Sequence, residues 1–145
     1  MMAAIRGKDT QPEIYVRKAL HRIGFRYKVH DQTLPGKPDL VFPKFKAVIL
    51  VNGCFWHQHD CHLFKWPTTR SKFWREKIQK NKERDKENQI KLEERGWKVL
   101  TIWECALKGK EKMAGAEVVN TISAWLINDP SSAEIRGRKS IKSHH

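Results

Sequence analysis

The sequence lacks the features that carry a chain into or onto a membrane. It contains no apolar run of about 18 residues, no secretory h-region and no lipidation motif. It also shows no internal repeat. These absences argue against a membrane-spanning, exported or lipid-anchored protein, and they predict a soluble protein of the cytoplasm.

Cysteine is scarce, because only Cys54, Cys61 and Cys105 occur in the chain. An odd number of cysteines without an export signal is unsuited to a disulfide framework. Metal ligation or reduced thiols are therefore the expected roles of these residues.

Acidic residues are few relative to basic ones. The chain has 16 Asp and Glu against 29 Lys and Arg, which gives a formal net charge of +13. A field of this sign favours a polyanionic partner, and nucleic acid is the first candidate. A basic protein of the membrane surface is the alternative, but no apolar segment supports it.

The length and the apolar content indicate one folded domain. With 145 residues, 39% hydrophobic content and six tryptophans, the chain can form one substantial core and is too short for two domains. We expect this domain at residues 1–128, where residues 1–9 form a mobile basic arm that contacts DNA. Residues 129–145 are polar enough to predict a disordered basic tail.

The order of helical and strand-like patterns predicts an α/β fold. Thr10 is the expected N-cap of a helix that ends near Ile23, because Glu13 follows three residues later as in a capping box. Ser71 is the expected N-cap of a long helix to about Arg95. The other expected elements are a strand at 25–29, a turn and strand at 34–42, strands at 47–51 and 97–103, and a helix at 116–127.

Asp39 stands near the start of one of these strands. The strand at 47–51 follows after a short connection, so the two are expected to pair as a hairpin. Antiparallel partners place the beginning of one strand beside the end of the other, which brings Asp39 near Asn52. The alternative is a turn acid without a partner, which its apolar neighbours would make costly to bury.

The segment from Val48 to His62 carries the most unusual chemistry. A buried apolar strand turns at Asn52-Gly53 into a loop that holds two cysteines, three histidines and the adjacent Phe55-Trp56 pair. An exposed aromatic pair of this size is costly unless it has a purpose. The function is therefore expected to centre on this loop.

The cysteines and histidines have the composition of a structural zinc site. Cys54, Cys61, one nearby histidine and Cys105 would give four ligands and leave no open position. Ordinary buried thiols are the alternative. Spacing alone does not choose among His57, His59 and His62.

Several longer motifs together resemble those of the very short patch repair endonucleases. They lie in unbroken order within residues 2–110: Leu34-Pro-Gly-Lys-Pro-Asp39, Asn52-Gly-Cys-Phe-Trp-His-Gln-His59, Cys61, Phe73-Trp74, 81–85, and Gly96-Trp97 through Trp103-Glu-Cys105. These bacterial enzymes resemble restriction endonucleases in fold, and they nick DNA on the 5′ side of the thymine in a T·G mismatch. Such mismatches arise when 5-methylcytosine is deaminated. The resemblance implies a restriction-endonuclease-like fold, with a central mixed β-sheet flanked by helices and a structural zinc site.

The resemblance also implies catalytic roles. Asp39 matches the acidic Mg²⁺ ligand, and the backbone carbonyl of Val51 matches a further ligand. His57 matches the histidine that activates the attacking water, while Asp85 and Glu13 match acids that hold waters on the metal or orient neighbours. Phosphodiester hydrolysis needs such parts, because a cation neutralises the phosphate and an imidazole acts as a base near neutral pH.

The position of Asn52 departs from the family. A well-known form has a second catalytic histidine there, and Asn52 replaces it in this chain. Asparagine can donate a hydrogen bond but has no titratable proton, so a mechanism with two histidines is not expected. The resemblance also leads us to expect a longer basic segment before Met2.

The remaining implied residues bind zinc or DNA. The implied zinc ligands are Cys54, His59, Cys61 and Cys105. The implied DNA contacts are an aromatic wedge of Phe55, Trp56 and Trp74, and an N-terminal arm with Met2, Arg6 and Lys8. Insertion of a wedge costs least at a mismatch, so the wedge itself would select for damaged DNA.

Three of these residues also have simpler explanations. Glu13 is equally suited to a capping box, Asp85 to a solvated helix face, and Trp74 to the core. At the level of function, the alternatives to mismatch-directed nicking are a zinc-stabilised DNA-binding module without catalysis and a nuclease without mismatch preference. A binding module would leave Asp39, His57 and Asp85 without a role. We expect a monomer that acts on double-stranded DNA near the bacterial nucleoid, with other mismatch-repair proteins as partners.

Overall fold

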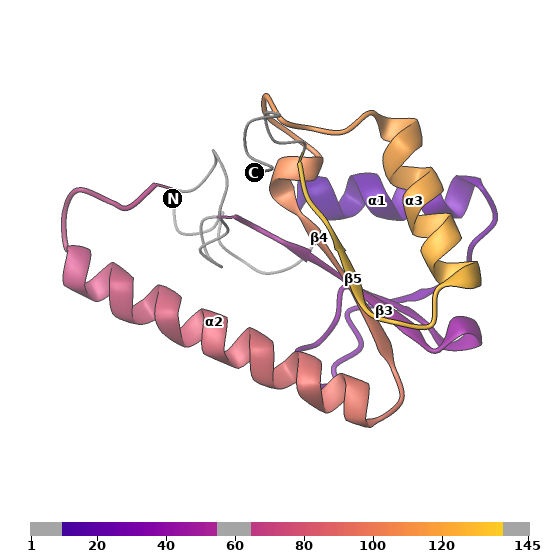
Figure 1. The fold of residues 1–145 in the computed structure, drawn as a ribbon, viewed down its shortest axis with the longest axis horizontal. Helices are drawn as coiled ribbons and strands as arrows, with labels where there is room; N and C mark the ends of the chain where they lie inside the picture. The colour runs from indigo at the N-terminus through magenta and orange to yellow at the C-terminus, as the bar shows by residue number, and fades with distance from the viewer. Residues whose placement is uncertain (1–9, 55–64, 138–145) are drawn as a thin grey trace, which may run out of the picture.

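The computed structural model describes residues 10–54 and 65–137. Its elements, shown in Figure 1, are α1 (Gln11–Arg22), β1 (Lys28–Val29), β2 (Leu40–Phe42), η2 (Pro43–Phe45), β3 (Ala47–Asn52), α2 (Ser71–Glu94), β4 (Lys98–Trp103), η3 (Glu104–Ala106), α3 (Gly115–Asn128) and β5 (Ala133–Ile135). The α/β class predicted from the sequence is confirmed.

The strands form a single mixed sheet in the order β1-β2-β3-β4-β5. Strand β2 runs antiparallel to both β1 and β3, whereas β4 runs parallel to both β3 and β5. The predicted hairpin is confirmed, because Leu40 pairs with Ile49 and Phe42 with Ala47. The short turn of η2 permits this antiparallel pairing, while the long α2 connection permits the parallel pairing of β3 with β4.

Helices cover both faces of the sheet, with α1 and α3 on one face and α2 on the other (Figure 1). Successive residues of a strand point to opposite faces, and this alternation divides the apolar side chains between two cores. The larger core packs against α1 and α3 and includes Val16, Leu20, Leu40, Phe42, Ile49, Leu100, Ile102, Ile122 and Trp125. The smaller core packs against α2 and consists of Val41, Val48, Leu92 and Val99.

Two helix starts test the capping predictions. The prediction for α1 is confirmed, because the Thr10 hydroxyl accepts a hydrogen bond from the Glu13 N–H at 3.3 Å. The prediction for α2 is wrong. Ser71 is already within the helix, and Arg70 is the N-cap residue with φ of 52° and no side-chain cap bond. The Arg70 guanidinium instead lies 4.4 Å from the centre of the Phe73 ring.

The first strand is shorter than predicted. Of the expected strand at 25–29, only Lys28–Val29 pairs with β2. Phe25 and Tyr27 make edge and tilted ring contacts with Phe42 rather than strand pairs. The alternating apolar pattern at Phe25 and Tyr27 therefore reflects packing of their rings against the larger core and does not mark a longer β-strand.

The tail predicted to be disordered from Asp129 is ordered through residue 137. Residues 133–135 form β5, which pairs with β4 at Leu100, Thr101 and Ile102. Lys98 explains the turn that leads there, because its ammonium donates hydrogen bonds to the backbone carbonyls of Trp125, Leu126 and Asp129 at the end of α3. The predicted arm at residues 1–9 and the last part of the predicted tail lie outside the described residues.

Candidate active site at the start of β2

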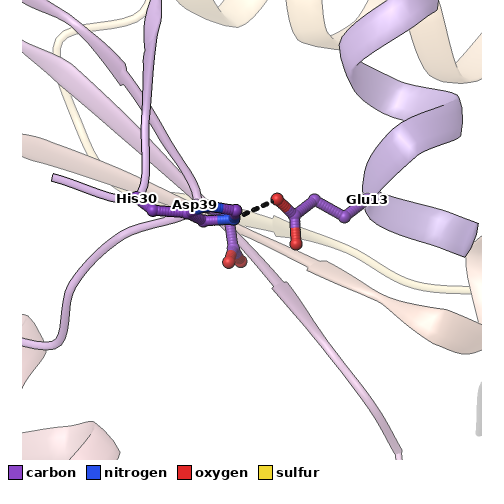
Figure 2. A group of neighbouring side chains, drawn as sticks. All are labelled: Glu13, His30 and Asp39. Atoms are coloured by element: carbon purple, nitrogen blue, oxygen red, sulfur yellow. Dashed lines mark hydrogen bonds and ion pairs between the residues drawn. The ribbon is translucent and has the colours of Figure 1, made fainter. Parts of the chain in front are cut away.

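Three side chains from different parts of the chain meet where β2 begins. Glu13 comes from the first turn of α1, His30 follows β1, and Asp39 precedes β2 (Figure 2). One ligating atom from each residue lies within 4.8 Å of the others. We call this group the Glu13–His30–Asp39 cluster.

Glu13 is almost completely buried, with 1% of its surface exposed. Its carboxylate accepts a hydrogen bond from the Arg17 guanidinium at 3.2 Å and lies 2.5 Å from Nε2 of His30. The helix N-terminus favours an acid here, but the capping role alone does not account for these two contacts. Glu13 is thus both a first-turn acid of α1 and a member of the cluster.

Asp39 is also buried, with 8% of its surface exposed. Its Oδ2 accepts a hydrogen bond from the Val51 N–H at 2.7 Å, so the predicted approach of Asp39 to the end of β3 is confirmed. Burial raises the pKa of Asp39 to about 7, because desolvation outweighs this hydrogen bond and the negative Glu13 adds to the rise. Without a cation, this carboxyl holds a proton up to neutral pH.

Sequence reasoning missed His30. Its backbone N–H donates to the Asp39 carbonyl at 3.1 Å, which continues the pairing of Val29 with Leu40 by one residue. The side chain is 18% exposed and points at Glu13. The position of His30 beside Glu13 and Asp39 follows from the register of β1 against β2. Because β1 has only two residues, the sequence pattern does not predict that register.

The strand register gives Val51 an unusual neighbour. Continuing the pairing of Leu40 with Ile49 sets Pro38 opposite Val51. Proline has no N–H, so position 38 cannot donate to the Val51 carbonyl. The N–H and the carbonyl of Val51 both point from β3 toward β2. The Val51 carbonyl oxygen therefore lies on the edge of β3 that faces Asp39.

The other predicted catalytic residues are not members of this cluster or lie outside the described residues. Asn52 is half-buried at the end of β3, beside Trp103 of β4. Asp85 is half-buried in the middle of α2, and no cluster of three metal-binding side chains in residues 10–54 and 65–137 includes it. It is therefore less exposed than a residue on a solvated helix face. His57 lies outside the described residues.

Two of the predicted zinc ligands follow the ends of the neighbouring strands β3 and β4. Asn52 pairs with Trp103, and Cys54 and Cys105 each follow two residues later. Both thiols are buried. The Cys54 N–H donates to the Glu104 carboxylate at 3.1 Å, and the Gly137 N–H donates to the Cys105 sulfur at 3.2 Å. His59 and Cys61 lie outside the described residues.

Gly137 permits the close approach of the chain after β5 to Cys105. A Cβ at this position would lie 2.5 Å from the Cys105 carbonyl oxygen and 2.7 Å from that of Glu111. Backbone oxygens cannot yield as a flexible side chain would. The hydrogen bond to the Cys105 sulfur therefore depends on the absence of a side chain at position 137.

Of the predicted DNA contacts, the structure describes only Trp74. It is half-buried near the start of α2, and its ring meets the Phe73 ring edge-on with 5.1 Å between centres. Full burial in the core is thereby excluded. The other predicted contacts lie outside the described residues: Met2, Arg6, Lys8, Phe55 and Trp56. Within the described ranges, no helix has the length and apolar character needed to cross a bilayer.

Comparisons with known proteins point to DNA cleavage. A sequence profile described as DNA mismatch endonuclease Vsr matches residues 1–63. The DNA mismatch endonuclease Vsr of Escherichia coli is 44% identical over 134 residues, which cover 92% of this chain and 86% of that protein. The type II nicking enzyme V.NmeAIP of Neisseria meningitidis is 47% identical over 110 residues, covering 76% and 79%. The type II nicking enzyme V.XorIIP of Xanthomonas oryzae is 43% identical over 107 residues, covering 74% and 79%.

Proposed function

Because the chain belongs to the Vsr family of DNA mismatch endonucleases, we propose that it nicks double-stranded DNA 5′ of the thymine in a T·G mismatch. The reaction is Mg²⁺-dependent hydrolysis of one phosphodiester bond, and its biological role is very short patch repair after 5-methylcytosine deamination. The formal charge of +13 suits the DNA backbone, which dominates the affinity of most DNA-binding proteins.

The observation that carries the proposal is the buried carboxylate of Asp39 beside the end of β3. Its hydrogen bond with the Val51 N–H fixes one oxygen, and Glu13 brings a second buried carboxylate to the same point. Burying two acids together is costly unless a cation or a proton offsets their repulsion. A binding module without catalysis would have no use for this arrangement.

These donors fit Mg²⁺, which prefers carboxylate and carbonyl oxygens. Asp39 and the Val51 carbonyl would hold the ion, and when bound it would neutralise charge on the scissile phosphate. Glu13 and Asp85 would orient water and neighbouring groups around it. Arg17, which donates to Glu13 at 3.2 Å, keeps the Glu13 carboxylate turned toward the cluster.

The proton transfer is assigned to His57. Its imidazole takes a proton from the attacking water as the oxygen approaches the phosphorus, which is the role of a general base near neutral pH. Asn52 donates a hydrogen bond to the phosphate but cannot carry a proton. A single histidine therefore serves as the base.

A structural zinc ion is proposed for the opposite half of the sheet. Cys54, His59, Cys61 and Cys105 would bind it in a closed tetrahedral site. Cys54 and Cys105 each follow two residues after the paired ends of two parallel strands, and this placement supports the set, as does the hydrogen bond from the Gly137 N–H to the Cys105 sulfur. The ion would anchor the loop that carries His57, within a restriction-endonuclease-like fold.

Mismatch selectivity is assigned to the aromatic wedge of Phe55, Trp56 and Trp74. Their rings would stack beside the opened base pair. The N-terminal arm would contact the minor groove and the phosphates through Met2, Arg6 and Lys8. Unstacking costs a few kcal/mol, and it costs least where pairing is already poor. The wedge would thus favour binding at a mismatch even without hydrogen bonds between the protein and specific bases.

The cleavage of one strand has support in the names of two relatives, which are type II nicking enzymes. The proposed setting is the bacterial cytoplasm near the nucleoid, where a monomer acts with other mismatch-repair proteins. The folded unit extends past residue 128, because β5 completes the sheet.

A panel of duplexes tests this function. The full chain is incubated with matched, T·G and other mismatched duplexes, each labelled on one strand, in Mg²⁺ or EDTA. We expect one nick 5′ of the mismatched thymine in Mg²⁺ and none in EDTA. Equal nicking of all duplexes would favour a nuclease without mismatch preference, and binding without nicking would favour the DNA-binding module.

A further inference from the structure

His30 adds nitrogen to a site otherwise built from oxygen. The described ranges contain two histidines, and they differ in their surroundings. His21 is exposed and meets the edge of the Tyr27 ring, whereas His30 is half-buried and faces the Glu13 carboxylate. An imidazole directed into a pair of buried carboxylates changes which cations the site can hold.

The three donors are held in place by independent contacts. Arg17 donates to Glu13 at 3.2 Å, the Val51 N–H donates to Asp39 at 2.7 Å, and the His30 backbone donates to the Asp39 carbonyl at 3.1 Å. Little conformational entropy remains to be lost when a ligand binds, which favours a bound cation.

The charges in the cluster also favour a cation. Two carboxylates converge on this point, and the Arg17 guanidinium contacts the Glu13 carboxylate. A neutral imidazole supplies a lone pair without adding positive charge. The cluster therefore offers a cation two carboxylate oxygens and one imidazole nitrogen.

We propose that Glu13, His30 and Asp39 together bind a divalent transition metal, with Nε2 of His30 as a direct ligand. Imidazole nitrogen binds transition metals much better than it binds Mg²⁺, which prefers oxygen. The site would consequently select Mn²⁺ over Mg²⁺, a preference that two carboxylates and a carbonyl alone would not give. This inference deepens the proposed function and rests on it for the catalytic use of the ion.

The distances suit this coordination after a small adjustment. Metal bonds to nitrogen and oxygen of about 2.0–2.2 Å set neighbouring ligand atoms about 3 Å apart and opposite ones about 4.3 Å apart. The three donors lie within 4.8 Å of one another, and the His30–Glu13 pair at 2.5 Å is the closest. An entering ion would open that pair by about 0.5 Å and replace the hydrogen between them.

Pulsed EPR of Mn²⁺ bound to the zinc-loaded full chain tests this proposal without using activity. A directly bound imidazole produces a nitrogen modulation in the Mn²⁺ echo. We expect this modulation in the wild type and its loss in His30→Gln. The Mn²⁺ affinity measured by calorimetry should fall at least about tenfold, the lower end of the loss seen for residues that merely orient a metal ligand. The Mg²⁺ affinity should change much less.

Two control variants assign the nitrogen signal. His21→Gln removes an exposed histidine of the same helix as Glu13 and should keep both the modulation and the Mn²⁺ affinity. His57→Gln removes the proposed base and should also keep the modulation. If His30→Gln fails to fold, wild-type protein labelled with ¹⁵N-histidine replaces it, because the label changes the modulation whenever histidine binds the ion.

The outcomes separate this inference from the proposed function. Mn²⁺ binding without nitrogen modulation in a protein that nicks T·G duplexes would overturn the role of His30 and leave the nicking activity in place. A modulation that disappears in His57→Gln instead of His30→Gln would overturn it equally. A His30-dependent modulation in a protein that nicks no duplex would support the metal site and contradict the proposed function.

Discussion

The antiparallel and parallel halves of the sheet gather different donor atoms. Where β1, β2 and β3 run antiparallel, the Asp39 carboxylate before β2 lies close to the Glu13 carboxylate from α1. Where β3 and β4 run parallel, the buried Cys54 and Cys105 each follow two residues after the paired ends of these strands. Hard oxygen suits Mg²⁺, whereas thiolate suits zinc. Strand β3 belongs to both halves, so one strand links the proposed catalytic and structural centres.

The comparison predicts that damage to the two halves has different consequences. A change in the antiparallel half should remove chemistry and leave the fold intact. A change in the parallel half should remove the fold and lose chemistry only as a result. Metal content, stability and nicking must therefore be measured on the same variants.

The largest expected effect is on the rate of nicking by Asp39→Asn. The amide keeps the shape of Asp39 and can still accept from the Val51 N–H, but it loses the charge that binds the metal. We expect no detectable Mg²⁺-dependent nicking, with DNA binding unchanged or slightly tighter. Gel-based nicking and fluorescence anisotropy measure the two quantities.

Asp31→Asn is the matched control for this variant. Asp31 lies in the turn before β2 and accepts hydrogen bonds from Thr33 rather than facing the cluster. It should nick DNA at the wild-type rate. Nicking by Asp39→Asn at the wild-type rate would contradict the assignment of Asp39 as the metal-binding carboxylate of the active site.

In the parallel half, Cys105→Ser should mainly lower stability. Loss of a structural metal is among the few changes that reduce the free energy of unfolding by more than about 4 kcal/mol. We expect the zinc content and the midpoint of urea unfolding to fall together. A variant that keeps both its zinc content and its stability would show that Cys105 is an ordinary buried thiol.

The pH dependence of stability should separate Asp39 from other acids in metal-free protein. Its pKa is raised to about 7 in the fold, so between the unfolded value of 3.8 and 7 the folded state binds the extra proton. The contribution of this group is therefore fully present below pH 3.8 and is lost as pH rises toward 7, a change of a few kcal/mol. Chemical unfolding of wild type and Asp39→Asn from pH 4 to 8 should show this slope only in the wild type. Identical slopes would contradict the buried, proton-holding carboxyl.

The smallest predicted effect concerns mismatch discrimination by Trp74. Replacing Trp74 with Ala should remove about 1–3 kcal/mol of stacking with a base while the zinc content stays constant. Phe73→Ala is the control, because Phe73 is the more exposed ring of the edge-on pair. Competition binding between T·G and matched duplexes measures the difference. Equal loss for both duplexes would assign Trp74 to packing alone.

The sequence predicted the parts of the fold that carry strong local signals. The capping sequence at Thr10 gave the start of α1, and the short connection at 43–46 gave the hairpin that brings Asp39 to Val51. Both depend on residues close together in the chain. Such features follow from turn chemistry and strand pairing without knowledge of distant contacts.

The missed features depend on distant contacts instead. His30 reaches Glu13 only because β1 pairs with β2, and β5 forms because Lys98 holds the end of α3 against the sheet. The three residues of β5 carry too short an apolar pattern to stand out in a polar tail. The position of His30 and the formation of β5 both depend on tertiary packing, so the periodicity and composition of the sequence could not predict them.

The most direct test measures zinc content and T·G nicking on one sample before and after brief EDTA treatment. The account predicts that nicking stops while each chain keeps its zinc and its far-UV circular dichroism spectrum, and that Mg²⁺ alone restores the activity. Persistent nicking without a divalent cation, or loss of zinc and fold in step with activity, would contradict the division of the sheet into a catalytic half and a structural half.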